Sequence, residues 1–188
     1  FQRRPTYMKL AHLPLAERAR EMAKPEIKAA IMSETDVLVD QPGSMANMYQ
    51  LFQTAAMFLY PLADPVDYEP DPSEMLGSRA AATGQDVLDL LYDYLLEQDG
   101  AAMCALMGGP NVHDSQEVLR QMLIHPETVT GLSDAGAHVT LICDATMPTT
   151  QLTFWARDRH KGERLPLEFL VAKQTARNAD LYGLKDRG

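Results

Sequence analysis

The sequence predicts an α/β fold in which helices outnumber strands. Between Asp71 and Leu184, segments whose apolar residues recur at helical spacing alternate with short apolar runs of strand length. Such alternation is typical of parallel βα units. The chain has 188 residues, 46% of them hydrophobic, so it can bury a core without disulfides or a structural metal. These observations together predict a folded α/β protein.

The charge balance argues against several classes of function. The chain holds 17 Lys and Arg against 26 Asp and Glu, which gives a formal net charge of −9. Nucleic-acid binding relies on clustered positive charge, so we expect no nucleic-acid partner. No apolar run approaches the roughly 20 residues that span a bilayer, and we expect no membrane partner. Cys104 and Cys143 each lie in an apolar run, and no leader pattern precedes them, which indicates a cytoplasmic protein.

The first third of the chain predicts two short helices and one strand. Residues 3–14 contain two prolines and are predicted to be irregular. Helices are expected over 13–22 and 25–34, because a proline in the first helical turn loses no hydrogen bond. The methionine-rich run 45–62 is expected to pack in the core and to include a strand near 57–62, with a contact surface as the alternative.

Helix caps organise the middle of the chain. Asp71 followed by a proline predicts a helix start, and this helix is expected to end at Gly84. Asp86 predicts the start of the next helix, which Asp99 and Gly100 close. The apolar run 101–107 follows and is predicted to be a buried parallel strand.

The last third predicts three helices and a strand. Glu117, three residues after an aspartate, indicates a capping box at the start of a helix that ends before Pro126. A short strand is expected over 128–132. Helices are then expected over 149–159 and 166–181, joined by a charged turn in which Arg157 and Arg159 are predicted to be solvated, as most arginines are.

The predicted strand 128–132 leads to a polar loop that could carry chemistry. Ligands of parallel α/β folds bind at the carboxyl ends of the strands, and Asp134 follows this one directly. A carboxylate there could bind a divalent metal and take a proton from metal-bound water. Taken alone, however, the local spacing favours an Asp134 that caps the following turn.

The run that begins GLSDAGAH at Gly131 and closes with QTARNADLYGLKDRG resembles the C-terminal barrel portion of the N-acyl-D-amino-acid deacylases, the D-aminoacylase branch of the amidohydrolase superfamily. Similarity continues upstream through YPLADPVDYEP and DVLDLLYDYLLEQDG, so it covers most of the chain. The resemblance implies one domain, with 45–188 as C-terminal βα units of a (β/α)₈ barrel and 1–44 as a helical and irregular lead-in or insertion. A full barrel needs eight strands and about 250 residues, so we expect an incomplete barrel and a chain cut from a longer protein.

The resemblance also implies an activity and its residues. It implies a hydrolase of amide bonds in N-acyl-D-amino acids that uses zinc or another divalent metal. Asp134 matches the superfamily aspartate that binds the metal, accepts a proton from the attacking water and passes it to the leaving amine. His138 and Asn111 are expected near the same site, in contact with the substrate or with the metal ligands. A structural histidine and a turn asparagine are the alternatives.

The sequence departs from the superfamily in its other ligands. Its five histidines are scattered and include no His-x-His pair. A catalytic zinc usually has three protein ligands, so we expect the isolated chain to be inactive. An arginine for the substrate carboxylate is not assigned. The alternative is a non-catalytic α/β module that self-associates, as a homo-oligomer, or binds a protein partner.

Overall fold

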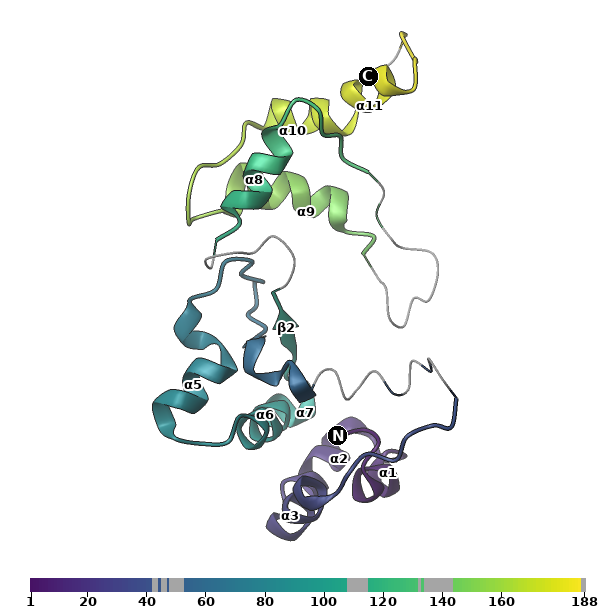
Figure 1. Cartoon of the computed structure of the whole chain (residues 1–188), viewed down its shortest axis with the longest axis vertical. Coiled ribbons are helices and arrows are strands. Elements are labelled where there is room, and N and C mark those ends of the chain that lie inside the picture. Colours follow the sequence, from purple (N-terminus) through teal and green to yellow (C-terminus); the bar gives the residue numbers. More distant parts are fainter. Residues whose placement is uncertain are drawn as a thin grey trace. The chain divides into compact units, whose positions relative to one another are not determined.

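The computed structural model describes residues 1–41, 44, 47, 53–107, 115–131, 133 and 144–186. The chain divides into two compact units, Phe1–Gly108 (unit 1) and Gly109–Gly188 (unit 2). Both contain helices, and unit 1 contains a small sheet, so the predicted α/β class is confirmed (Figure 1). The division does not coincide with the boundary predicted after residue 44.

Unit 1 begins with three short helices that lie together in Figure 1. They are α1 (Pro5–Leu10), α2 (Leu15–Met22) and α3 (Pro25–Ser33). The predicted helices correspond to α2 and α3, whereas the prediction that residues 3–14 are irregular is wrong. Pro5 is the first residue of α1, where its missing N–H leaves no carbonyl without a donor, so the proline begins this helix instead of preventing it.

The side-chain caps predicted at Asp71 and Asp86 are present, but the single helix predicted from Asp71 to Gly84 is interrupted at Met75, whose backbone is not helical. Asp71 accepts a hydrogen bond of 2.9 Å from the Ser73 N–H at the start of a 3₁₀ turn, Pro72–Glu74. Helix α5 (Leu76–Thr83) follows and ends at Gly84, whose φ of 71° lies in the left-handed region that glycine adopts readily. Asp86 caps the start of α6 (Val87–Leu95), and a short turn, α7 (Glu97–Gly100), closes this helical segment.

The sheet has two strands that run antiparallel. Strand β1 (Leu59–Pro61) follows a 3₁₀ turn (Ala56–Phe58) and pairs with β2 (Cys104–Leu106), with Leu59 opposite Leu106. Both segments lie inside predicted strands, but the prediction of a buried parallel strand is wrong, because Leu106 is 49% exposed. An apolar run of strand length does not determine which segment pairs with it, nor in which direction.

Two apolar clusters and a buried tyrosine hold unit 1 together. One cluster centres on Ala56, Leu59, Leu76 and Leu91, and the other on Met22, Ile31 and Tyr92. The Tyr92 hydroxyl donates a hydrogen bond of 2.8 Å to the carbonyl of Met22, and burial raises the pKa of Tyr92 to about 12. Helix α6 therefore packs against the segment that joins α2 to α3.

Unit 2 consists of helices around one apolar cluster. They are α8 (Glu117–Ile124), α9 (Met147–Thr153) with a π-helical turn (Phe154–Asp158), α10 (Leu167–Gln174) and α11 (Ala176–Leu181). Figure 1 shows α8, α9 and α10 grouped together, around the buried side chains of Phe154, Trp155, Leu165 and Leu170. The three predicted helical regions are confirmed, and the last is broken at Thr175.

The strand predicted over 128–132 is not present in its described part. Residues Thr128 to Gly131 are irregular, and Leu132 lies outside the described residues. Side chains of α10 and α11 bind the backbone of this segment: Lys173 donates to the carbonyl of Thr128, and Asn178 donates to that of Thr130. These carbonyls thus bond to helix side chains instead of to a neighbouring strand.

The predicted solvation of Arg159 is wrong, because this side chain is 1% exposed. Its guanidinium donates to the carbonyls of Glu163 (2.7 Å) and Lys161 (3.2 Å) and to Glu117 (3.2 Å), and it lies 4.9 Å from the centre of the Trp155 ring. The charged turn therefore closes around Arg159. Arg157 is exposed as predicted and pairs with the adjacent aspartate.

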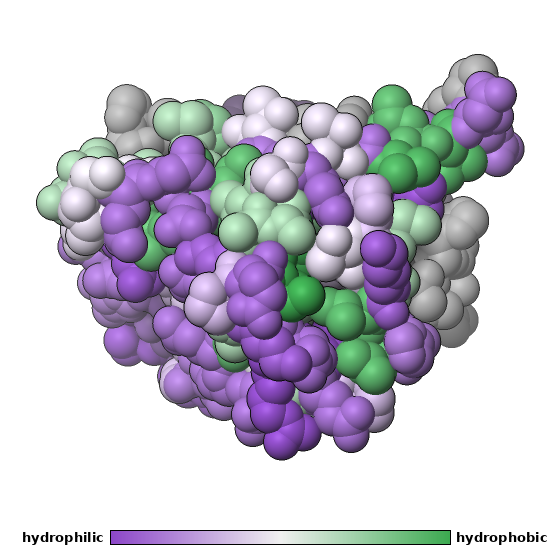
Figure 2. All heavy atoms as spheres, turned by 90° about the horizontal axis from the view of Figure 1, so that it is seen from below, coloured by the Kyte–Doolittle hydropathy of each residue, from purple (hydrophilic) through white to green (hydrophobic). Residues whose placement is uncertain are grey.

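The surface of the chain is mostly hydrophilic on the face drawn in Figure 2, where apolar side chains emerge in separate patches between charged ones. Scattered apolar side chains are ordinary on protein surfaces. Within the described part of the chain, no helix combines the length and the apolar character needed to cross a membrane.

Candidate functional site

The three residues predicted to form the site, Asp134, His138 and Asn111, all lie outside the described residues. Their roles therefore remain predictions. The structure does describe most of the segment that precedes Asp134, including residues 125–131 and Ser133. The attachment of this segment to unit 2 can be described residue by residue.

Lys173 of α10 is the main attachment point. Its side chain is 1% exposed, and its ammonium group donates hydrogen bonds to the carbonyl of His125 (3.1 Å), to the hydroxyl of Thr128 (2.9 Å) and to the carbonyl of Thr128. Burial lowers the pKa of the Lys173 amine, and the nearby charge of Arg177 lowers it further. Three oxygens thus compensate a buried cation and hold the loop after α8 against α10.

A second attachment lies close to the first. The Thr130 hydroxyl donates to the carbonyl of Lys173 at 3.1 Å, and the Asn178 amide of α11 donates to the carbonyl of Thr130 at 3.0 Å. The same amide also donates to Gln174 at 3.3 Å, which fixes its orientation. The segment is therefore bound to α10 and α11 up to Thr130, four positions before Asp134 in the sequence.

The described residues do not by themselves fit a metal. No group of three or more His, Cys, Asp and Glu side chains among them is close enough to hold an ion. His125 is exposed, and its Nδ1 accepts a hydrogen bond of 3.2 Å from the Glu127 N–H, so this ring atom serves the turn.

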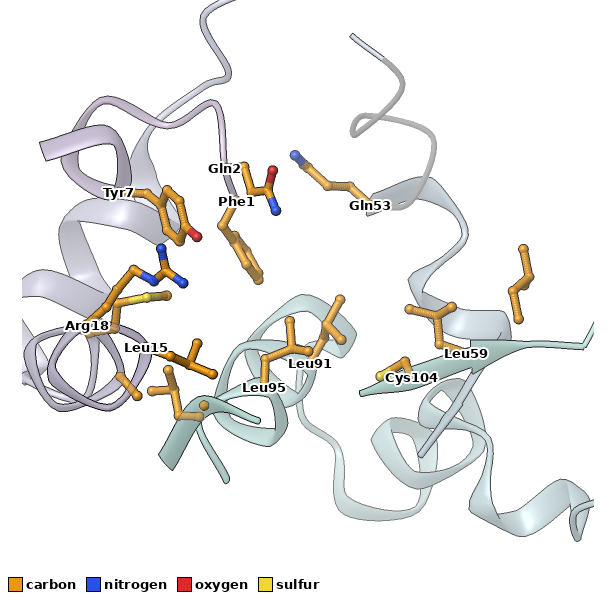
Figure 3. Close-up of a pocket in the computed structure, with 15 residues that line it drawn as sticks. Phe1, Gln2, Tyr7, Leu15, Arg18, Gln53, Leu59, Leu91, Leu95 and Cys104 are labelled. Carbon is orange, nitrogen blue, oxygen red and sulfur yellow. The ribbon is translucent and has the colours of Figure 1, made fainter. Parts of the chain in front are cut away.

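Unit 1 contains a pocket that the sequence analysis missed. Its volume is about 400 Å³, and its wall is mainly leucine side chains from α2 and α6 together with residues of the sheet. Figure 3 shows Arg18 and Tyr7 at one side, Leu91 and Leu95 between, and Cys104 at the opposite side. One sequence signal could have indicated it: Arg18 lies on the same face of α2 as Leu15, Ala19 and Met22, so a cation interrupts an apolar stripe.

A buried ion pair supports one part of the pocket wall. The Nε atom of Arg4 lies 3.8 Å from Asp36 Oδ1, and the two side chains are 7% and 4% exposed. Gln53, which lines the pocket, joins both: its carbonyl oxygen accepts from Arg4 at 3.3 Å, and its amide donates to Asp36 at 2.5 Å. Both polar atoms of the Gln53 amide are therefore occupied by this pair.

Cys104 contributes a weakly nucleophilic thiol to the same pocket. Its thiol is free, and burial raises its pKa to about 11. The thiolate is the nucleophilic form of cysteine, so Cys104 is a neutral thiol at pH 7. The pocket is thus suited to binding an apolar group and not to nucleophilic chemistry at this residue.

Comparisons with models of protein families, with curated proteins and with solved structures found no match to this chain.

Proposed function

We propose that this chain is part of a metal-dependent hydrolase that cleaves the amide bond of N-acyl-D-amino acids, with Asp134 as its proton-transferring carboxylate. The observation that carries the proposal is the run from Gly131 to Gly188, which resembles the last barrel portion of the D-aminoacylases and places Asp134 in their aspartate motif. We further propose that the chain forms C-terminal βα units of a (β/α)₈ barrel and acts in the cytoplasm.

The attachment of residues 125–130 supports this proposal. The closing run 174–188, which contains α11, resembles the last barrel helix of the family. Lys173 and Asn178 bond this segment to α10 and α11. A βα unit likewise brings the segment before a loop against a helix, although here the segment is irregular and side-chain hydrogen bonds make the contact.

The described sheet is antiparallel, so the proposal requires other strands to complete a parallel barrel. The reaction also requires more ligands than Asp134. A bound metal would polarise the amide carbonyl and activate water, and it usually needs three protein ligands. Asp134 would take a proton from the water and deliver it to the leaving amine. We propose that the remaining ligands come from residues outside the printed sequence.

The test compares the 188-residue chain with a longer protein whose reading frame contains it. We expect the longer protein to release the free amino acid from N-acetyl-D-amino acids when it holds zinc, and the printed chain to release none. Asp134→Asn should lower kcat of the longer protein about 10²- to 10⁴-fold, the usual contribution of a general acid–base group. The control is Asp144→Asn, because Asp144 is exposed. If the 188-residue chain released the amino acid and Asp134→Ala abolished this release, the prediction that further metal ligands are required would be contradicted.

A second candidate is a module that self-associates. Large apolar side chains around the two-stranded sheet are exposed: Met57 at 48%, Phe58 at 51%, Met103 at 59% and Leu106 at 49%. Exposed apolar side chains that belong to one small sheet and its flanking residues can form a protein contact. Sedimentation would show a dimer that Phe58→Glu converts to monomers; a strictly monomeric printed chain would exclude this candidate.

A further inference from the structure

We propose that the pocket of unit 1 binds a linear aliphatic monocarboxylate, with the carboxylate on Arg18 and the hydrocarbon chain along the leucines. This site lies in a different unit from Asp134, and it does not depend on the proposed hydrolase function. The inference rests on the shape of the pocket, on its apolar wall and on the one charged side chain that faces it.

The size and shape of the pocket suit a small elongated ligand. Its volume of about 400 Å³ lies within the roughly 300–1,000 Å³ of small-molecule sites. In Figure 3 Arg18 and Leu59 are at opposite sides, and Leu91 and Leu95 of α6 lie between them. A ligand that begins at Arg18 would thus run over apolar side chains.

Arg18 has hydrogen-bond donors to offer to an anion. The side chain is half-buried, and its Nη1 atom donates to the Ala11 carbonyl at 3.2 Å. Its guanidinium carbon lies 5.6 Å from the centre of the Tyr7 ring, which holds the group at one side of the pocket. A guanidinium has five N–H donors and binds carboxylates in a bidentate manner. Within the described residues, no carboxylate pairs with Arg18, and the nearby Glu21 pairs instead with Lys24 at 2.6 Å.

The other polar groups of the pocket do not compete for the same ligand. Gln53 is held by Arg4 and Asp36, and Cys104 is a neutral thiol. Arg18 is the charged side chain among the residues that line the pocket. An apolar wall with Arg18 as its charged side chain favours an amphipathic anion over a neutral or cationic molecule of the same length.

The first experiment measures ligand affinity of the 188-residue chain by calorimetry. Decanoate should bind with saturation at one site, and decyltrimethylammonium, which has the same chain length and the opposite charge, should bind at least tenfold more weakly. Arg18→Gln should weaken decanoate binding about tenfold, the effect of one charge-assisted hydrogen bond. Arg20→Gln is the matched control, because Arg20 is exposed on the same helix and does not line the pocket. It should leave the affinity unchanged.

The second experiment locates the ligand through Cys104. In a Cys143→Ser background, decanoate should slow the reaction of Cys104 with a thiol reagent, and the Arg18→Gln variant should need a higher concentration for the same protection. Circular dichroism establishes that each variant is folded. Absence of saturable decanoate binding, equal affinity in folded Arg18→Gln, or binding that leaves Cys104 unprotected would each overturn the proposal. None of these readouts uses hydrolase activity, so the two proposals fail independently.

Discussion

Two buried cations, Arg4 of unit 1 and Lys173 of unit 2, are compensated in different ways. In unit 1 Arg4 lies near the carboxylate of Asp36, and Gln53 joins the two side chains. In unit 2 Lys173 donates to uncharged oxygens of residues 125–128. In a buried pair of opposite charges, the attraction mainly offsets the free-energy cost of removing the charges from water. A buried cation that donates to backbone carbonyls also fixes the loop that supplies those carbonyls. In unit 2 the buried charge of Lys173 therefore positions a segment of chain, residues 125–128.

Removal of the carboxylate in unit 1 should have the largest effect. Asp36→Ala leaves Arg4 buried without its counterion, and breaking such a pair costs about 3 kcal/mol of unfolding free energy. Hydrogen exchange of peptides from unit 1 would measure this loss of unfolding free energy. Asp40→Ala, at an exposed position close by, should change little. Equal protection in the two variants would show that the ion pair does not stabilise unit 1.

Removal of the cation in unit 2 should cost somewhat less. Lys173→Met keeps the length of the side chain but removes its hydrogen bonds, and we expect a loss of about 2 kcal/mol. Trp155, the single tryptophan, lies in the core of unit 2 and reports its unfolding in urea. Lys185→Met is the control, because Lys185 is 79% exposed. Exchange should also rise selectively in residues 125–131, and a uniform rise throughout unit 2 would contradict the positioning role.

The turn around Arg159 gives a test of backbone geometry in unit 2. Gly162 has a φ of +135°, and a Cβ atom there would lie 2.8 Å from an Arg159 nitrogen. Gly162→Ala should therefore lower the unfolding free energy by about 1–2 kcal/mol in the Trp155 assay. Gly131→Ala meets no atom within 4 Å and is the matched control. Equal stability of the two variants would show that the turn relaxes without cost.

The smallest expected effect is a pH dependence in unit 2. Hydrogen bonds from Arg120, and then from Arg159, lower the pKa of Glu117 below its ordinary value of 4.5. A lowered native pKa stabilises the fold above pH 4.5, and this stabilisation is lost as the pH falls through the lowered value. Thermal unfolding followed through Trp155 should show a shallower decline below pH 4.5 in Glu117→Gln than in the unchanged chain. Parallel declines would contradict this contribution.

Local features of the fold were predictable from the sequence. The caps at Asp71 and Asp86 follow from a side chain that bonds an N–H two or three residues away. The termination of α5 at Gly84 follows from the left-handed backbone conformation that glycine adopts readily. Such contacts depend on neighbouring residues alone. They were therefore placed correctly without knowledge of the tertiary structure.

The features that the sequence predicts wrongly depend on residues that are far apart in the sequence. Arg159 is buried because Glu117, 42 positions earlier, and a turn of backbone carbonyls surround it. Residues 128–131 are irregular because the side chains of Lys173 and Asn178, more than 40 positions away, donate hydrogen bonds to backbone carbonyls of this segment. For the candidate site, the sequence predicts Asp134, His138 and Asn111, and the structure adds the attachment of residues 125–130, which precede Asp134. The pocket around Arg18 was missed because its wall is assembled from α2, α6 and the sheet.

The most direct test of the central claim is the hydrolysis of paired enantiomers by the zinc-loaded longer protein. The account predicts release of the free amino acid from N-acetyl-D-leucine, much slower release from N-acetyl-L-leucine, and loss of both in Asp134→Asn. Hydrolysis of neither enantiomer, or hydrolysis that Asp134→Asn leaves unchanged, would contradict it.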